Sequence, residues 1–127
     1  IMLSNRTKLK AEELRNYYKK KNLNENIITV VDWGELPNFD VIINATSVGL
    51  KRGQTLDLDF SKIEKGKFFY DVIYNPKETN FLKAGKQLGN QTENGKKMFI
   101  YQAAEAFKIW HKVEPEINEE INKLLDQ

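Results

Sequence analysis

The sequence has no cysteine, a single histidine and only three prolines in its 127 residues. The absence of cysteine excludes a disulfide framework, a thiolate zinc site and a thiol nucleophile. It is also typical of proteins from a reducing compartment. We therefore expect a cytoplasmic protein without a metal site.

Long hydrophobic runs are missing as well. No apolar stretch approaches the ~20 residues that a membrane-spanning helix needs, and no signal peptide is recognisable. The formal net charge of +2 is too small to suggest a nucleic-acid partner. Hydrophobic residues at 40% and charged residues at 30% are ordinary for a single globular domain. We therefore expect neither a membrane nor a nucleic acid as partner.

Runs of apolar residues predict alternating strands and helices. Val-, Ile- and Phe-rich runs predict strands at 1–3, 27–31, 41–43 and 68–72. Apolar residues three and four positions apart predict helices at 8–21, 80–88, from 97 onward and 116–125, and a short helical turn at 61–65. Strands separated by helices are typical of parallel α/β proteins. The helical residues expected to face a core include Ala11, Leu14, Tyr18, Phe81, Leu82, Leu88, Ile100, Ala103, Ala104, Phe107, Trp110, Ile117, Ile121 and Leu124.

The stretch Val41–Gly49 changes abruptly from apolar to polar. A β-branched run is followed at once by Asn44, Thr46 and Ser47, as when a buried strand ends in a polar loop. Ligands of open α/β sheets bind beyond the carboxyl ends of the parallel strands. This loop is therefore a candidate binding site, although these nine residues by themselves are more typical of a buried strand that ends in an ordinary surface turn.

A basic turn follows the first predicted strand. Asn5, Arg6, Thr7 and Lys10 lie there, and the turn contains no acidic residue. In a dinucleotide-binding fold an acid at this place binds the ribose 2′-hydroxyl of NAD, whereas basic residues accommodate the 2′-phosphate of NADP. The turn therefore favours NADP. The alternative is that Thr7 only caps the helix and that the basic side chains point into solvent.

Other polar residues carry weaker signals. By themselves, Asp71 is typical of a turn or cap acid, Tyr74 of a packing residue and Gln102 of an exposed helical glutamine. His111 is expected near the end of a helix, without a catalytic role. The pyrophosphate-binding motif G-x-G-x-x-G does not occur. We therefore expect that the sequence begins within a cofactor domain.

Five motifs occur in an order and spacing that resemble the C-terminal half of shikimate dehydrogenase, over nearly the whole chain. They are Asn5-Arg6-Thr7-x-x-Lys10, Asn44-Ala45-Thr46-Ser47-Val48-Gly49, Asp71-Val72-Ile73-Tyr74-Asn75-Pro76-x-x-Thr79, Asn94-Gly95-x-x-Met98 and Gln102-Ala103-Ala104-x-Ala106-Phe107-x-x-Trp110. The resemblance implies a partial Rossmann-like, doubly wound parallel sheet with C-terminal helices, residues 1–127 being a truncated NADP-binding domain.

The resemblance also implies a function, the reversible reduction of 3-dehydroshikimate to shikimate with NADP(H). It assigns the family's catalytic lysine and its partner aspartate to an N-terminal substrate domain, so no catalytic residue is expected in residues 1–127. The small-molecule substrate that the resemblance implies is shikimate or 3-dehydroshikimate. Whether the protein is a monomer or a homodimer stays open.

The residue roles follow from the same resemblance. The residues matching cofactor contacts are Asn5, Arg6, Thr7 and Lys10 at the adenosine 2′-phosphate, Asn44, Thr46 and Ser47 under the cofactor, and Val72 and Gly95 at the nicotinamide end. Those matching contacts to substrate hydroxyl and carboxylate groups are Tyr74 and Gln102. The family usually has arginine where this sequence has Lys10, which loosens a bidentate phosphate contact.

Alternative functions remain open at this point. One is a non-catalytic relative that senses shikimate or quinate. Another is a different enzyme with a related cofactor domain, such as a quinate dehydrogenase or a glutamyl-tRNA reductase. A plain interaction domain would require all five motifs to be accidental.

Overall fold

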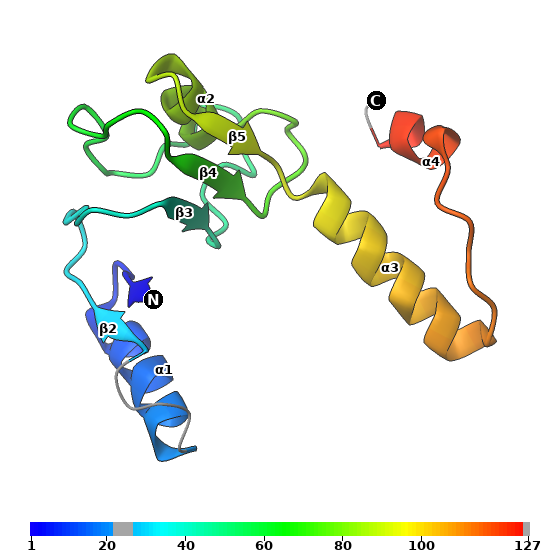
Figure 1. Cartoon of the computed structure of the whole chain (residues 1–127), viewed down its shortest axis with the longest axis horizontal. Helices are drawn as coiled ribbons and strands as arrows, with labels where there is room; N and C mark the ends of the chain where they lie inside the picture. The colour runs from blue at the N-terminus through cyan, green and yellow to red at the C-terminus, as the bar shows by residue number, and fades with distance from the viewer. Residues whose placement is uncertain (22–26, 126–127) are drawn as a thin grey trace. The chain divides into compact units, whose positions relative to one another are not determined.

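The computed structural model describes residues 1–21 and 27–125 (Figure 1). They belong to two compact units, which we describe separately. The N-terminal unit comprises Ile1–Pro37 and Asp57–Asp59, and the C-terminal unit comprises Asn38–Leu56 and Phe60–Gln127.

The N-terminal unit is a single β-α-β motif. Strand β1 (Met2–Leu3) pairs in parallel with β2 (Thr29–Val30), and helix α1 (Lys8–Lys20) precedes β2 and packs against it. Both strands are shorter than predicted. Of the helical residues predicted to face a core, Ala11 is buried, whereas Leu14 is 45% exposed.

The C-terminal unit contains a three-stranded parallel sheet in the order β3-β4-β5. Its strands are β3 (Val41–Asn44), β4 (Phe68–Asp71) and β5 (Gln91–Glu93), and helix α2 (Asn80–Gln87) lies between β4 and β5 in the chain and packs against both. The prediction of a parallel α/β protein is thus confirmed. Strand β5 was not predicted, because its three residues are polar. It lies at the edge of this sheet and pairs through its backbone with β4.

The core of this unit is aromatic. Phe69 of β4 is fully buried against Phe81 of α2, with 5.2 Å between ring centroids. Gly85 allows α2 to approach this closely, since a Cβ atom there would lie 2.6 Å from the Phe69 ring. Leu82 completes the buried cluster. The partly buried residues packed on it are Phe39, Ile42, Leu56, Phe60 and Ile63.

Helix α2 begins where the sequence predicts and ends one residue earlier, at Gln87. The Thr79 hydroxyl accepts a hydrogen bond from the Leu82 N–H at 3.3 Å, as expected of an N-cap. Gly89, with φ at +77°, follows the helix. The predicted helical turn at 61–65 is wrong, because Ser61 and Lys62 form a turn and no helix.

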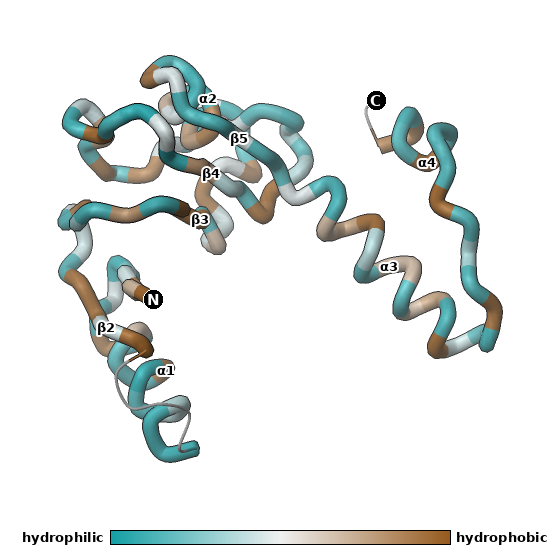
Figure 2. Tube along the Cα trace, viewed as in Figure 1, coloured by the Kyte–Doolittle hydropathy of each residue, from teal (hydrophilic) through white to brown (hydrophobic). Residues whose placement is uncertain are grey.

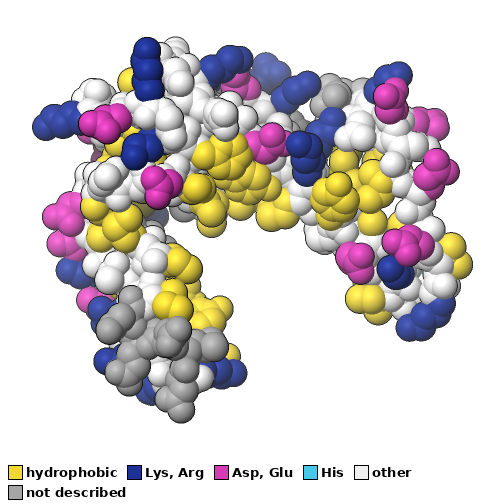
Figure 3. Space-filling model, viewed as in Figure 1, with side chains coloured by type: hydrophobic (Ala, Val, Ile, Leu, Met, Phe, Trp, Pro, Cys, Tyr) yellow, Lys and Arg dark blue, Asp and Glu magenta, His cyan; other side chains and the backbone are white. Residues whose placement is uncertain are grey.

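Two further helices follow the sheet, α3 (Lys96–His111) and α4 (Glu119–Leu124). Figure 2 shows apolar and polar residues interspersed along α3. Figure 3 shows hydrophobic side chains, in yellow, at the surface of the molecule. The predicted core face of α3 is confirmed at Ile100 but wrong at Phe107 and Trp110, which are 41% and 77% exposed. Periodicity predicts a helix and its apolar stripe but not what covers that stripe. Within the described ranges, no helix is long and apolar enough to cross a membrane.

Candidate functional site

The basic turn of the N-terminal unit connects β1 to α1. The Asn5 Oδ1 atom accepts the Thr7 N–H at 2.8 Å, and the Thr7 carbonyl accepts the Lys10 N–H at 2.9 Å. Thr7 occupies the N-cap position, but its hydroxyl makes no capping hydrogen bond. Thr7 therefore occupies the N-cap position that the sequence predicts, but its side chain does not cap the helix. Arg6 and Lys10 are exposed.

An ion pair lies beside this turn. Lys8 Nζ is 2.6 Å from Asp32 Oδ1, and both side chains are more than half exposed. The hydrogen bond to Asp32, reinforced by the charge of that carboxylate, raises the pKa of Lys8. Lys8 therefore already has an anionic partner within the unit, whereas Arg6 and Lys10 are the basic residues with which the sequence predicts a phosphate contact.

In the C-terminal unit the predicted site residues follow the carboxyl ends of neighbouring strands. Asn44 ends β3 and is paired in register with Asp71 at the end of β4. Val72 and Tyr74 follow β4, and Gly95 follows β5. The structure thus collects most of the predicted residues at the edge of the sheet where ligands of parallel α/β proteins bind.

Asn44 holds the loop after β3 in shape. Its Oδ1 atom accepts the Thr46 N–H at 3.1 Å and the Thr46 hydroxyl at 2.8 Å, and its Nδ2 atom donates to the Val48 carbonyl at 3.0 Å. Asn44 is only 3% exposed, whereas Thr46 and Ser47 are exposed. The exposed polar side chains of this loop are therefore Thr46 and Ser47, and the Thr46 hydroxyl already donates to Asn44 and accepts the Val48 N–H.

Asp71 connects the two loops of this edge. It is fully buried, and its Oδ1 atom accepts from Asn44 Nδ2 at 3.2 Å and from the Ile73 N–H at 3.0 Å. The Thr79 hydroxyl donates to Oδ2 at 2.6 Å. The sequence predicts that Asp71 is a turn or cap acid. Its bonds to the Ile73 N–H and to the hydroxyl of Thr79, the N-cap of α2, agree with this prediction. The bond to Asn44 could not be seen in the sequence, because it joins residues 27 positions apart.

Val72 and Gly95, the two residues matched to the nicotinamide end, lie against each other. A Cβ atom at position 95 would lie 1.9 Å from the Val72 carbonyl oxygen, so only glycine fits there. The Gly95 N–H also donates to the Ile73 carbonyl at 3.1 Å. The start of α3 is therefore bound directly to the backbone of the loop after β4.

Tyr74 and Gln102, the two residues matched to substrate contacts, both touch Phe99. The Tyr74 and Phe99 rings are stacked with 4.6 Å between centroids and 27° between planes. Gln102 is exposed, and its Nε2 atom donates to the Phe99 carbonyl at 3.1 Å. No motif in the sequence includes Phe99, and its aromatic character was the only available signal.

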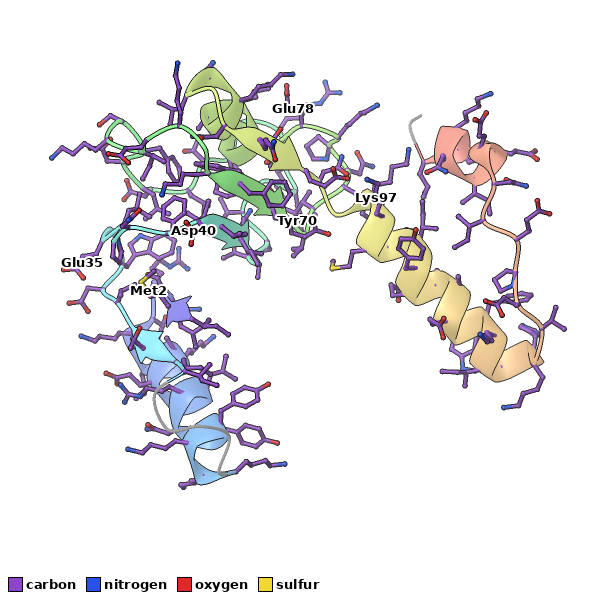
Figure 4. The ribbon with its side chains drawn as sticks, in the orientation of Figure 1. Met2, Glu35, Asp40, Tyr70, Glu78 and Lys97 are labelled. Atoms are coloured by element: carbon purple, nitrogen blue, oxygen red, sulfur yellow. The ribbon has the colours of Figure 1, made fainter. Side chains whose placement is uncertain are left out.

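An open cavity of about 560 Å³ lies elsewhere in the C-terminal unit, and none of the predicted site residues lines it. Cations and acids are mixed around it, and Lys97 and Glu93 form an ion pair at 3.2 Å. Figure 4 labels Lys97 at the start of α3 and Glu78 in the segment before α2. This mixture of charges does not define a ligand class. The lining residues are Lys77, Glu78, Leu82, Thr92, Glu93, Asn94, Lys96, Lys97 and Asn122.

Known proteins are similar to this chain in sequence and in structure. A shikimate dehydrogenase (NADP(+)) of Pelagibacter ubique is 55% identical over 126 residues, which are 99% of this chain and 45% of that protein. A crystal structure of a shikimate dehydrogenase in complex with NADP+ has a TM-score of 0.82 at 37% identity, covering 99% of this chain and 45% of that one. The quinate dehydrogenase of Corynebacterium glutamicum, in complex with NAD, has a TM-score of 0.84 at 27% identity, covering 99% of this chain and 46% of that one. No family model matches.

The strand topology and these neighbours define the chain as a Rossmann-like α/β protein, as the sequence predicts. By sequence the chain is similar to shikimate dehydrogenases (NADP(+)) along 99% of its length. It spans about half the length of the curated relatives that it matches.

Proposed function

We propose that this chain is part of an NADP-dependent shikimate dehydrogenase, an oxidoreductase that interconverts 3-dehydroshikimate and shikimate. The observation that carries the proposal is the 55% identity to a shikimate dehydrogenase (NADP(+)) along 99% of the chain. The exposed Arg6 and Lys10 after β1, without an acid in the turn, support NADP rather than NAD. Since the chain lacks cysteine, a reducing compartment such as the cytoplasm is the proposed location.

The residues of the basic turn fit the adenosine 2′-phosphate of NADP. The Thr7 hydroxyl makes no capping bond, and no acidic residue lies in the first turn of α1. Arg6 provides a planar fork for two phosphate oxygens, and Lys10 adds a point charge one turn away. The N–H groups at the start of α1 favour an anion in the same place.

In the C-terminal unit the proposed roles are positioning and substrate binding. NADP(H) supplies the hydride chemistry itself. Val72 and Gly95 form the backbone surface proposed for the nicotinamide end, where a side chain at position 95 would not fit. Tyr74 and Gln102 are proposed to bind hydroxyl and carboxylate groups of shikimate. We assign no proton transfer to any of these residues.

A titration of the chain with 2′,5′-ADP and 5′-AMP, followed by NMR, tests the cofactor assignment. The two nucleotides differ only in the 2′-phosphate, so we expect 2′,5′-ADP alone to shift the amides of Arg6, Thr7 and Lys10 at millimolar concentration. Arg6→Ala should abolish this selectivity, whereas Arg52→Ala, which removes an exposed arginine of the C-terminal unit, should not. Equal responses to both nucleotides, or none in a folded chain, would contradict the assignment.

A quinate dehydrogenase is the second candidate, because the quinate dehydrogenase of Corynebacterium glutamicum has the same fold. Initial rates of the full-length gene product with shikimate or quinate, each with NADP+ or NAD+, separate the two candidates. We expect the highest kcat/KM for shikimate with NADP+. The 127-residue chain by itself should show no turnover, since it contains no glycine-rich pyrophosphate turn.

A further inference from the structure

Phe99 touches both proposed substrate-binding side chains. Its ring stacks on Tyr74 with 4.6 Å between centroids, and its carbonyl accepts the Gln102 Nε2–H at 3.1 Å. The two contacts use different parts of Phe99. A change of side chain at position 99 therefore acts on the Tyr74 contact and leaves the carbonyl that holds Gln102 in place.

The position of Phe99 is itself determined by the loop that carries Tyr74. The Phe99 N–H donates to the Gly95 carbonyl at 2.9 Å, and the Gly95 N–H donates to the Ile73 carbonyl at 3.1 Å. These bonds connect the first turn of α3 to the residue next to Tyr74. Because Gly95 also lies against the Val72 backbone, α3 cannot shift along the loop without breaking this packing.

We propose that Phe99 is a positioning residue for the substrate, whose ring holds the Tyr74 phenol in its binding orientation and whose carbonyl holds Gln102. This inference rests on the proposed function. Tyr74 and Phe99 are both partly buried, and their stacked rings are in direct contact. A stacked partner reduces the rotational freedom that Tyr74 would lose on binding, which favours binding without a new contact to the ligand.

Phe99→Leu, made in the full-length gene product, tests the proposal. It removes the aromatic ring, keeps an apolar side chain and retains the helix. We expect the KM for shikimate to rise about fivefold, which corresponds to the typical interaction free energy of an aromatic pair. The kcat and the KM for NADP+ should stay within twofold of the parent. Phe99→Tyr keeps a stacking ring and should restore the parent KM.

Phe107→Leu is the matched control. Phe107 lies on the same helix and receives the same chemical change, but its ring contacts His111 at 4.3 Å between centroids rather than Tyr74. It should leave the KM for shikimate within twofold of the parent. An equal rise in KM in Phe99→Leu and Phe107→Leu would mean that α3 responds as a whole, and it would overturn the proposal.

A double-mutant cycle with Tyr74→Phe shows whether Phe99 acts through the Tyr74 hydroxyl. Tyr74→Phe keeps the ring and removes the hydroxyl. If the proposal is right, Phe99→Leu changes the KM for shikimate by less than twofold in the Tyr74→Phe background, because there is no hydroxyl left to orient. A full additional fivefold rise in that background would overturn it.

The stacking can also be tested without activity. In the 127-residue chain, Phe99→Leu should shift the Tyr74 ring protons in NMR spectra, since they lose the ring current of Phe99, while Phe107→Leu should not. Unchanged Tyr74 signals overturn the inference whatever the substrate is. A full-length parent protein without shikimate activity, in contrast, contradicts the proposed function, and it does so before any variant is compared.

Discussion

The two units of the chain present their predicted ligand-binding residues in different ways. In the N-terminal unit they lie on an exposed turn, and Ala11 is its only buried hydrophobic residue among those that the structure describes. In the C-terminal unit most of them belong to loops near a buried carboxylate, Asp71, beside an aromatic core, and Gln102 lies on α3. Binding by charge tolerates an exposed, solvated turn, whereas binding by shape and hydrogen bonds requires a supported loop. The predictions below test this difference, from the largest expected effect to the smallest.

Phe69→Ala should be the most destabilising change. The fully buried ring contacts α2, so its loss should lower the free energy of unfolding of the C-terminal unit by about 3–5 kcal/mol. Urea unfolding, followed by NMR signals from each unit, measures this value. Phe107→Ala removes the same side chain where it is 41% exposed and should cost less than about 2 kcal/mol. Equal losses in the two variants would show that the aromatic core does not support this unit.

Asp71→Ala should cost about 3 kcal/mol, because Asn44, Ile73 and Thr79 would lose the acceptor of their hydrogen bonds inside the protein. Asp71→Asn keeps one oxygen and should cost less. Hydrogen exchange should show faster opening of the Thr46 and Val48 amides in Asp71→Ala, since Asn44 holds both residues. If those amides keep their protection, Asp71 does not support the loop after β3.

Lys10→Arg should affect ligand binding and not folding. Arginine restores a planar fork at the end of the basic turn, so 2′,5′-ADP should bind about fivefold more tightly, while 5′-AMP binding stays unchanged. NMR or calorimetric titration measures both affinities. Lys20→Arg, in the last turn of α1, is the control. Weaker binding of 2′,5′-ADP by Lys10→Arg would show that Lys10 does not lie next to the phosphate.

Asp32→Asn should have the smallest effect. The Lys8–Asp32 pair raises the pKa of Lys8 above its ordinary value of 10.5, so it stabilises the folded chain fully below that pH and loses this effect as the pH rises through the raised pKa. Asp32→Asn should return the Lys8 pKa toward 10.5, as ¹⁵N NMR of the lysine side chain would show. Stability near pH 7 should hardly change, since both side chains are exposed. An unchanged Lys8 pKa would mean that the pair does not form in solution.

Much of the fold could be predicted because local patterns carry it. The boundaries of α1 and α2 were predicted to within one residue, and the positions of β3 and β4 followed from short apolar runs. Strand β5 could not be predicted, since polar edge residues form a strand only when β4 lies beside them. The prediction that Phe107 and Trp110 face a core was wrong for a related reason. An apolar stripe on a helix does not specify which element, if any, covers it.

The sequence by itself determined the order of the elements, the resemblance to shikimate dehydrogenases and the chemical types of the candidate site residues, because spacing, turn residues and motifs are properties of neighbours along the chain. Only the tertiary structure decided which side chains support the others. The Asp71–Asn44 bond, the close fit of Gly95 to Val72 and the stacking of Phe99 on Tyr74 each join residues at least 20 positions apart. Such contacts depend on how the strands and helices pack, and no local pattern encodes them.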